Sequence, residues 1–295
     1  MSADHEKGSG KPLAPGLYLV ATPIGNLEDI TLRALRILRD VDRIACEDTR
    51  QTQKLLNHFE IRTPTISYHM HNEGPRAEEL VAELKAGVRI AVVSDAGTPG
   101  IADPGTQIAA EAIAAGIDVF PVPGANAAIS GLIASGLPAE QFIFHGFLPA
   151  KAGQRKTALE ELVRNDATHV FYEAPHRILD SLADIEAVFG TSQHIVIARE
   201  LTKLHEEFLR GPVGEIRSKL GARASVRGEI VLMLALSPAG TSPEKKKSGI
   251  AVEVAGLMNS EGIGEMDALK RIARERGMGK SEAYRELQRE QNRLR

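Results

Sequence analysis

Residues 88–105 read VRIAVVSDAGTPGIADPG, and this stretch decides which kind of fold the chain can adopt. Its first seven residues form a short, mostly apolar and β-branched run, which is typical of a buried strand. The twelve residues from Ser94 to Gly105 then include three Gly, two Pro and two Asp. Glycine lets the backbone approach a ligand closely, and proline fixes its path. Because this loop exceeds what a tight turn needs, we predict a ligand site at the end of a strand.

Strands and amphipathic helices alternate around this stretch. Apolar runs predict strands over residues 16–21, 43–46, 65–69 and 119–122. Apolar residues at helical spacing predict helices over residues 30–38 and 76–85. This alternation implies βαβ units and a mostly parallel sheet covered on both faces. In such sheets ligands bind outside the carboxyl ends of the strands, so we expect the chemistry in the segments that follow them.

The second half of the chain indicates another α/β layer with mixed strand pairing. A helix of small residues is predicted over 125–135 and another over 179–188, with strands over 142–145, 169–172, 194–198 and 228–236. A Pro/Ser/Gly/Lys-rich linker follows, and then two helices over 265–276 and 281–289. We therefore expect a flexible tail, two α/β domains and a linker with a basic helical domain, over residues 1–12, 13–124, 125–240 and 241–295.

Composition and charge exclude several classes of protein. The single Cys46 rules out a disulfide framework and a Cys-rich zinc site, and no apolar run approaches the length of a membrane span. The polar N-terminus has no apolar segment of the kind found in signal peptides, so we expect a cytoplasmic protein. The first 240 residues carry a net charge of −6 and residues 241–295 carry +3. A basic end on an acidic body favours an anionic partner for that end.

Standard nucleotide and metal motifs do not explain the predicted site. The chain has neither G-x-G-x-x-G after its first strand nor a G-x-x-x-x-G-K-[ST] motif. His69 and His71 would point the same way on a strand, but no Cys and no second His pair accompany them. We predict no metal. The charged residues of Glu173–Arg177 and Arg199–Lys203 fit a structural role and a place at the mouth of a cleft equally well.

Five separated motifs resemble a known superfamily. Residues 21–31 (ATPIGNLEDIT), 46–50 (CEDTR), 67–72 (SYHMHN), 94–100 (SDAGTPG) and 171–177 (FYEAPHR) resemble the tetrapyrrole methylases, in particular the bacterial branch that methylates small-subunit ribosomal RNA. The likeness runs from about Gly16 to Arg289. The porphyrin-methylating branch typically has Gly-Pro-Gly-Asp-Pro and Gly-Gly-Asp-Pro where this chain has residues 22–27 and 95–98, which argues against a tetrapyrrole substrate.

The resemblance implies a fold, a cofactor and a reaction. It implies two α/β domains with S-adenosylmethionine (SAM) in the cleft between them, a small C-terminal helical domain, and a homodimer. It also implies 2′-O-methylation of a cytidine in the decoding region of 16S ribosomal RNA. The cofactor-binding residues predicted on this basis are Pro23, Asp95, Ala96, Gly97, Thr98, Ile101, Asn126, Ala127 and Tyr172.

Methyl transfer to a ribose hydroxyl needs a proton acceptor or a polarising cation, because the hydroxyl is a weak acid. Candidates near predicted strand ends are Asp48, Glu173 and Lys203, and Lys203 would serve as a base only if its pKa were depressed. For contacts with RNA we predict Arg50, Arg177, Lys280, Arg285 and Arg289. Two alternatives remain open: a SAM-dependent methyltransferase of a small molecule such as a tetrapyrrole, and a non-enzymatic RNA-binding assembly factor.

Overall fold

A computed structural model describes residues 13–293 except for residues 71, 163–166, 237–249 and 276–277. The chain divides into two compact units, residues 1–236 and 237–295. The predicted flexible tail and the core of the predicted linker lie outside the described residues. The boundary proposed near residue 124 falls inside the first unit, between its two sheets.

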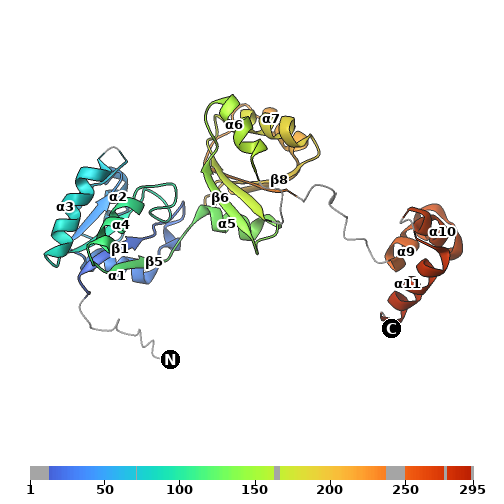
Figure 1. The fold of residues 1–295 in the computed structure, drawn as a ribbon, viewed down its shortest axis with the longest axis horizontal. Helices are drawn as coiled ribbons and strands as arrows, with labels where there is room; N and C mark the ends of the chain where they lie inside the picture. The colour runs from blue at the N-terminus through green and yellow to red at the C-terminus, as the bar shows by residue number, and fades with distance from the viewer. Residues whose placement is uncertain (1–12, 71, 163–166, 237–249, 276–277, 294–295) are drawn as a thin grey trace. The chain divides into compact units, whose positions relative to one another are not determined.

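The first sheet is fully parallel, as the alternation of strands and helices predicted. Its strands lie in the order β3 (Thr65–Ser67), β2 (Arg43–Cys46), β4 (Arg89–Val93), β1 (Gly16–Val20) and β5 (Val119–Val122). Helices α1 (Leu32–Asp40) and α2 (Thr49–His58) pack on one face, and α3 (Glu73–Lys85) and α4 (Thr106–Ala114) on the other (Figure 1). Their apolar faces form two separate cores, so both faces of the sheet are buried.

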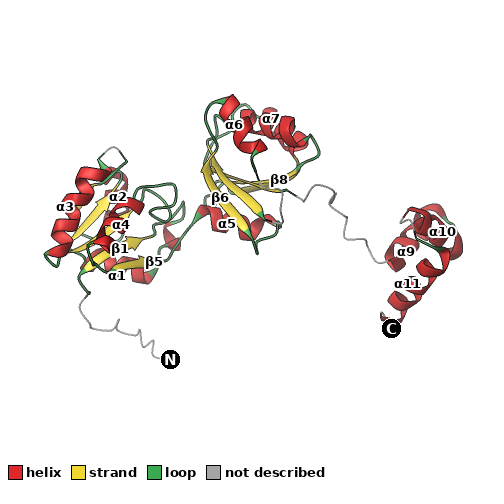
Figure 2. Ribbon diagram, in the orientation of Figure 1, coloured by secondary structure: helices red, strands yellow, loops and turns green. Residues whose placement is uncertain are grey.

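The second sheet is mixed, again as predicted. Its order is β6 (Phe142–Phe147), β7 (Thr168–Glu173), β10 (Ile230–Ala235), β8 (His194–Arg199) and β9 (Glu207–Pro212). Only β6 and β7 are parallel. Helices α6 (Ala152–Glu160), α7 (Ile178–Phe189) and α8 (Val213–Gly221) share one core with this sheet, and α5 (Ala127–Ser135) packs on its other face (Figure 2).

The sequence pattern missed one strand and two helices in this half. Strand β9 reads EFLRGP, and its Glu, Arg, Gly and Pro break the apolar run that marks a strand. It is an edge strand with a single neighbour, so its residues need to be only half-buried. Helix α6 buries only Arg155 and Leu159, which leaves a weak apolar periodicity. Helix α8 buries Val213, Ile216 and Leu220 at helical spacing, so the sequence does carry a signal for it.

The second unit is a bundle of three helices, α9 (Ile250–Glu261), α10 (Glu265–Glu275) and α11 (Lys280–Arg293). The last two were predicted from the sequence, over residues 265–276 and 281–289. Their buried residues, among them Ile250, Leu269, Ile272 and Leu287, form a core of their own. In the part of the chain that the structure describes, no helix has the length and apolarity to cross a membrane.

The core of the second sheet should tolerate truncation poorly. Leu232, in the central strand β10, is fully buried, and Ile113, on α4, is 65% exposed. A buried leucine loses its transfer free energy and leaves a cavity when it is cut to alanine. We expect Leu232→Ala to lower the free energy of unfolding by about 2–5 kcal/mol in urea denaturation. Ile113→Ala is the control and should change it by less than about 0.5 kcal/mol; equal effects would contradict this assignment of the core.

Candidate active site

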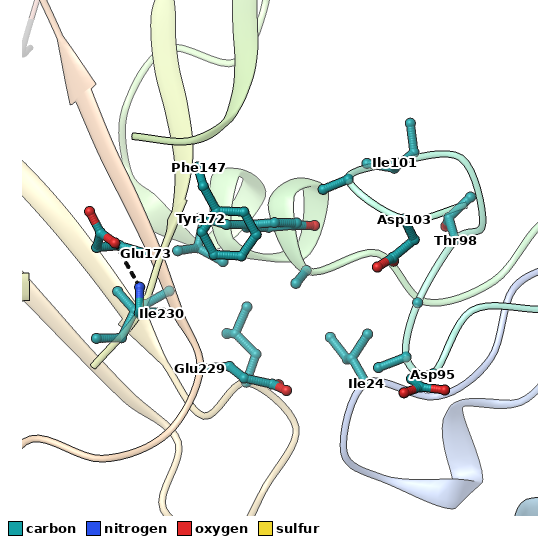
Figure 3. A pocket seen from close by; sticks show the side chains of 18 of the residues that line it. Ile24, Asp95, Thr98, Ile101, Asp103, Phe147, Tyr172, Glu173, Glu229 and Ile230 are labelled. Atoms are coloured by element: carbon teal, nitrogen blue, oxygen red, sulfur yellow. Dashed lines mark hydrogen bonds between the residues drawn. The ribbon is translucent and has the colours of Figure 1, made fainter. Parts of the chain in front are cut away.

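A cavity of about 420 Å³ lies between the two sheets of the first unit (Figure 3). Its volume falls within the usual range for small-molecule sites, about 300–1,000 Å³. Segments that follow β1, β2, β4 and β5 supply one wall, which is the carboxyl edge of the parallel sheet. The lining residues are Ile24, Glu47, Asp95, Ala96, Gly97, Thr98, Ile101, Ala102, Asp103, Ala127, Phe147, Tyr172, Glu173, Ala174, Pro175, Ala198, Leu201, Glu229, Ile230 and Val231.

The glycine-rich loop after β4 is held at both ends. At its start, the N–H of Thr22 donates to the carbonyl of Gly97 at 2.8 Å, and the N–H of Gly97 donates back to the carbonyl of Thr22 at 3.0 Å. At its end, a carboxylate oxygen of Glu73 accepts a hydrogen bond from the N–H of Gly105 at 3.2 Å. Tyr68 donates its hydroxyl to the same oxygen at 2.8 Å. The loop is therefore a rigid wall.

The path of this loop depends on backbone conformations that few residues accept. Gly97 and Gly100 both have φ of 82° and Gly105 has φ of 140°, all of which glycine tolerates without a steric penalty. Ala102 has φ of 64°, in the left-handed region that costs a residue with a Cβ about 1–2 kcal/mol. Such strained residues persist only where the surrounding structure fixes them, and they concentrate at ligand sites.

Several loop residues that line the cavity have backbone N–H groups without a protein acceptor. Among the described residues, nothing accepts a hydrogen bond from the N–H groups of Ala96, Thr98, Ala102 and Asp103. Ala96, Thr98 and Asp103 are half-buried, and buried N–H groups normally find an acceptor. These free donors suit a ligand that carries a carboxylate or other acceptors.

The cavity is also acidic. Glu47, Asp95, Asp103 and Glu229 all line it. Burial raises the pKa of Asp103 to about 6, and the charges of Glu47, Asp95 and Glu229 add to this effect. Burial likewise raises the pKa of Glu47, with a further contribution from Asp95. A ligand that brings positive charge would relieve this repulsion, so the cavity favours a ligand with both cationic and acceptor groups.

Seven of the nine predicted cofactor-binding residues line the cavity, namely Asp95, Ala96, Gly97, Thr98, Ile101, Ala127 and Tyr172. The other two do not. Pro23 precedes the lining residue Ile24, and Asn126 caps helix α5, where its side-chain oxygen accepts a hydrogen bond from the N–H of Ile129 at 3.1 Å. Asn126 therefore positions the start of α5, and its neighbour Ala127 reaches the cavity.

Sequence reasoning found Tyr172 and Glu173 at the end of β7 but missed the part of the second wall that β10 provides. Glu229, Ile230 and Val231 belong to the amino end of β10, because β10 runs antiparallel to β7 and β8. A search at the carboxyl ends of strands cannot find such residues. The sequence signal for this wall is the glycine before Glu229. In the structure Gly228 has φ of 89°, and a Cβ there would clash with the side chain of Glu200, so this position requires glycine.

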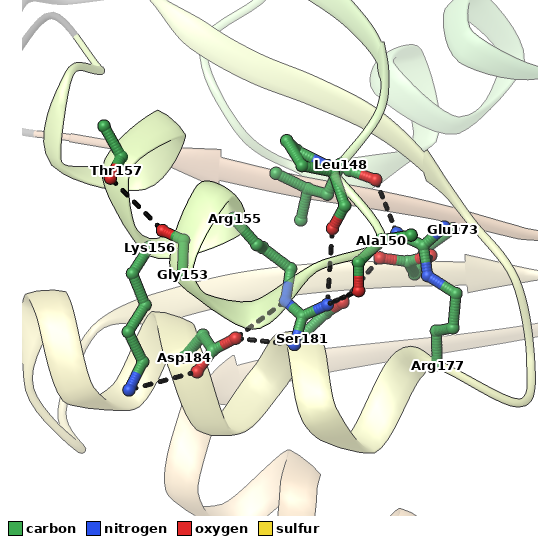
Figure 4. Close-up of polar contacts among 11 residues, drawn as sticks. Leu148, Ala150, Gly153, Arg155, Lys156, Thr157, Glu173, Arg177, Ser181 and Asp184 are labelled. Carbon is green, nitrogen blue, oxygen red and sulfur yellow. Dashed lines mark hydrogen bonds and ion pairs between the residues drawn. The ribbon is translucent and has the colours of Figure 1, made fainter.

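Glu173 lines the cavity only by part of its surface, and its carboxylate is fully buried elsewhere (Figure 4). Its two oxygens accept hydrogen bonds from the N–H of Ala174 at 2.8 Å and the hydroxyl of Ser181 at 2.5 Å. Arg177 lies 3.3 Å away and donates to the carbonyl of Leu148. This network ties the end of β7 to α7 and to the segment after β6, so Glu173 has the surroundings of a structural carboxylate.

Asp48 and Lys203, the other predicted proton acceptors, are also engaged. Asp48 caps α2, where its carboxylate accepts from the N–H of Arg50 at 2.8 Å. The ammonium of Lys203 pairs with Glu200 at 2.9 Å and with Glu229 at 3.0 Å. Burial lowers the pKa of Lys203, but these two partners outweigh it and the pKa is raised. The depressed pKa that a lysine base requires is therefore absent.

The predicted RNA-binding residues are spread over both units. Arg50 is exposed at the start of α2, whereas Arg177 is used within the network around Glu173. In the second unit Arg285 and Arg289 are exposed on α11 beside the half-exposed Tyr284. The side chain of Lys280 lies outside those that the structure describes.

No group of three or more His, Cys, Asp or Glu side chains among the described residues is arranged to hold a metal ion. His71, which the sequence paired with His69, lies outside the described residues.

The sequence and the fold are similar to those of known methyltransferases. Residues 16–217 match the family of Tetrapyrrole (Corrin/Porphyrin) Methylases. A protein of Halalkalibacterium halodurans named "Ribosomal RNA small subunit methyltransferase I" is 48% identical over 270 residues, which cover 91% of this chain and 93% of that protein. A protein of the same name from Escherichia coli O157:H7 is 49% identical over 234 residues, 79% of each chain.

Solved structures show the same fold at lower identity. A diphthine synthase superimposes with a TM-score of 0.58 at 14% identity, and covers 74% of this chain and 89% of its own. A uroporphyrin-III-C-methyltransferase from Thermus thermophilus gives a TM-score of 0.54 at 20% identity, with 75% and 94% covered. The two-sheet fold with a cavity between the sheets, the match to the family and the relatives of high identity agree. The chain therefore belongs to the tetrapyrrole methylase family, and within it to the group of ribosomal RNA small subunit methyltransferase I proteins.

Proposed function

We propose that this chain transfers the methyl group of SAM to the 2′-hydroxyl of a cytidine ribose in the decoding region of 16S ribosomal RNA, in the cytoplasm. The observation that carries the proposal is the acidic cavity with free backbone donors, in a chain whose relatives are named as ribosomal RNA methyltransferases. The finer details of nucleotide and position come from the resemblance of its motifs to this group.

The residues of the cavity fit SAM. Its amino-acid carboxylate can accept from the free N–H groups of the loop after β4, and its positive charges suit the carboxylate of Asp95. Ile24, Ala127 and Val231 supply apolar surface for the adenine ring. When bound, SAM supplies an activated methyl group on a sulfonium. The protein's task is then to hold and orient the substrate hydroxyl and to receive its proton.

The residues around the cavity support this task indirectly. Glu173 fixes the end of β7, from which Tyr172 faces the cavity. Lys203 holds Glu229 through an ion pair, and its loop meets the segment after β1, where the N–H of Asn26 donates to the Thr202 hydroxyl at 3.1 Å. We propose that both residues position the walls of the site rather than exchange protons.

The function is tested with labelled SAM and small ribosomal subunits from cells that lack this modification. We expect transfer of label to one cytidine, located by mapping the labelled nucleotide and identified as a 2′-O-methyl ribose by nuclease resistance. Unmodified tetrapyrroles and fully modified subunits are the controls. Label on a tetrapyrrole alone would favour the small-molecule alternative, and absence of SAM binding in calorimetry would favour a non-enzymatic assembly factor.

We propose that the second unit contributes affinity for RNA through Arg285 and Arg289 on α11. Each arginine that neutralises a phosphate releases counterions, so its removal should weaken binding and flatten the salt dependence. Replacing both with alanine in the full chain should reduce the slope of log K against log salt by about 1–2, with SAM affinity unchanged. Arg217→Ala, an exposed arginine of α8 paired with Glu186, is the control. An unchanged slope would remove α11 from the interface.

We also propose that the chain forms a homodimer through the apolar surface of α5 and the edge strand β6. Ile129 and Ile133 lie one turn apart on α5, and Ile133 is 74% exposed; Phe142 on β6 is also exposed. Ile133→Asp should yield a monomer in light scattering at concentrations where the unmodified chain is a dimer, because burying a carboxylate is costly. Ile113→Asp, on the exposed face of α4, should leave the dimer intact; a dimer in both variants would exclude this surface.

A further inference from the structure

The proposed reaction needs a proton acceptor. The carboxylates and the lysine predicted for this role from the sequence are already engaged in hydrogen bonds or ion pairs within the protein. Asp48 caps a helix, Glu173 is locked in a buried network, and Lys203 carries a raised pKa. A general base must instead lie in the cavity, within reach of the substrate hydroxyl, with a lone pair that no protein group uses.

Asp103 meets these conditions. It lines the cavity, and its carboxylate points into the open space toward the side formed by Tyr172 and Glu229 (Figure 3). Within the described part of the chain, no donor forms a hydrogen bond or ion pair with this carboxylate. The other lining carboxylates differ: Asp95 accepts from the N–H of Asp48 at 3.1 Å, and Glu229 pairs with Lys203. Glu47 lacks a partner as well, but it is less buried than Asp103.

The backbone around Asp103 holds its side chain in this position. The preceding residue, Ala102, is left-handed, and the following residue, Pro104, has a fixed φ and accepts a hydrogen bond from the N–H of Gly100 at 3.2 Å. The hydroxyl of Thr106 donates to the carbonyl of Gly100 at 3.3 Å. A catalytic group must be held within a fraction of an ångström of its working position. The two hydrogen bonds to Gly100 fix the backbone on which Asp103 stands.

The electrostatic surroundings tune Asp103 for proton transfer near neutral pH. The titratable groups that face it are Glu47 after β2, Asp95 after β4, Tyr172 at the end of β7 and Glu229 before β10. Burial and these carboxylates raise its pKa to about 6. A base is most effective when its pKa lies near the operating pH, since it is then both ionised and able to bind a proton.

We infer that Asp103 is the catalytic base of the methyl transfer, an assignment that rests on the proposed function. Asp103 takes the proton from the 2′-hydroxyl while the ribose oxygen forms its bond to the methyl carbon. The carbon–sulfur bond breaks and its electron pair stays on sulfur. The products are a 2′-O-methyl ribose, a neutral thioether and a protonated Asp103, which then releases its proton to solvent.

The variant Asp103→Asn tests this inference, because it keeps the size of the side chain and removes the basic oxygen. We expect the single-turnover rate of RNA methylation to fall at least 100-fold at saturating SAM. The affinity for SAM, measured by calorimetry, should change less than about threefold, and Asp103→Glu should recover part of the rate. Asp118→Asn is the matched control, since this exposed aspartate lies before β5 at the opposite edge of the sheet.

Two further measurements do not depend on turnover of the variant. Carbon-13 NMR of the free protein should show one aspartate carboxyl that titrates near pH 6, and that signal should be missing in Asp103→Asn. In the unmodified chain the rate should decrease as the pH falls through the ionisation of Asp103, because the protonated carboxyl cannot accept a proton. The variant should keep a low rate with no such decrease.

The outcomes separate this inference from the proposed function. If the unmodified chain labels no ribosomal RNA, the function fails, whatever Asp103 does. If the chain is active and Asp103→Asn retains its rate and its pH profile, Asp103 is not the base. If the variant loses SAM affinity in proportion to its rate, Asp103 is a cofactor ligand, and the inference is equally overturned.

Discussion

The structure depends on the reciprocal pair of backbone hydrogen bonds between Thr22 and Gly97. This bridge joins the segment after β1 to the loop after β4, at the ends of two adjacent strands. Two residues beyond Thr22, Ile24 enters the apolar core formed by α5 and the second sheet. One short segment therefore fixes the glycine-rich loop and contacts the opposite wall of the cavity. A side chain at position 97 would be strained at φ of 82° and would press on Ile24, which explains glycine there.

The rigidity of the loop is what makes its exposed groups useful. A ligand with acceptors and positive charge satisfies the free N–H groups and lowers the repulsion among the carboxylates at the cavity. The hydrogen bonds of Glu73 and Thr22 hold the two ends of the loop and so keep these groups in place. Residues in unfavourable conformations, stabilised by the rest of the fold, are expected at a functional site. Ala102, with its left-handed backbone, is such a residue in the glycine-rich loop.

The first sheet and its loops could be predicted from sequence because parallel strands all end at one edge. That rule predicted a ligand site in the loop from Ser94 to Gly105. The family resemblance then indicated the residues Asp95, Ala96, Gly97, Thr98, Ile101 and Ala127, which line the cavity. In the second wall the rule holds for Tyr172 and Glu173 at the end of β7, but it misses Glu229–Val231, since antiparallel β10 brings its amino end to the cavity. Residue type alone does not choose among the predicted proton acceptors. The fold surrounds Glu173 with Ser181 and Arg177 and pairs Lys203 with Glu200 and Glu229, and these contacts are not visible in the sequence pattern.

The distribution of charge constrains how RNA can be recognised. A cavity lined by four carboxylates repels phosphates, so the backbone of an RNA substrate gains nothing by entering it. A neutral ribose hydroxyl carries no such penalty, and its proton is what an unpaired carboxylate can accept. Affinity must then come from outside the cavity, and the basic second unit, which carries +3 against −6 for the rest of the chain, supplies the opposite sign. We therefore propose that RNA affinity resides in the second unit and methyl transfer at the cavity, because one surface could not have the charge that both require.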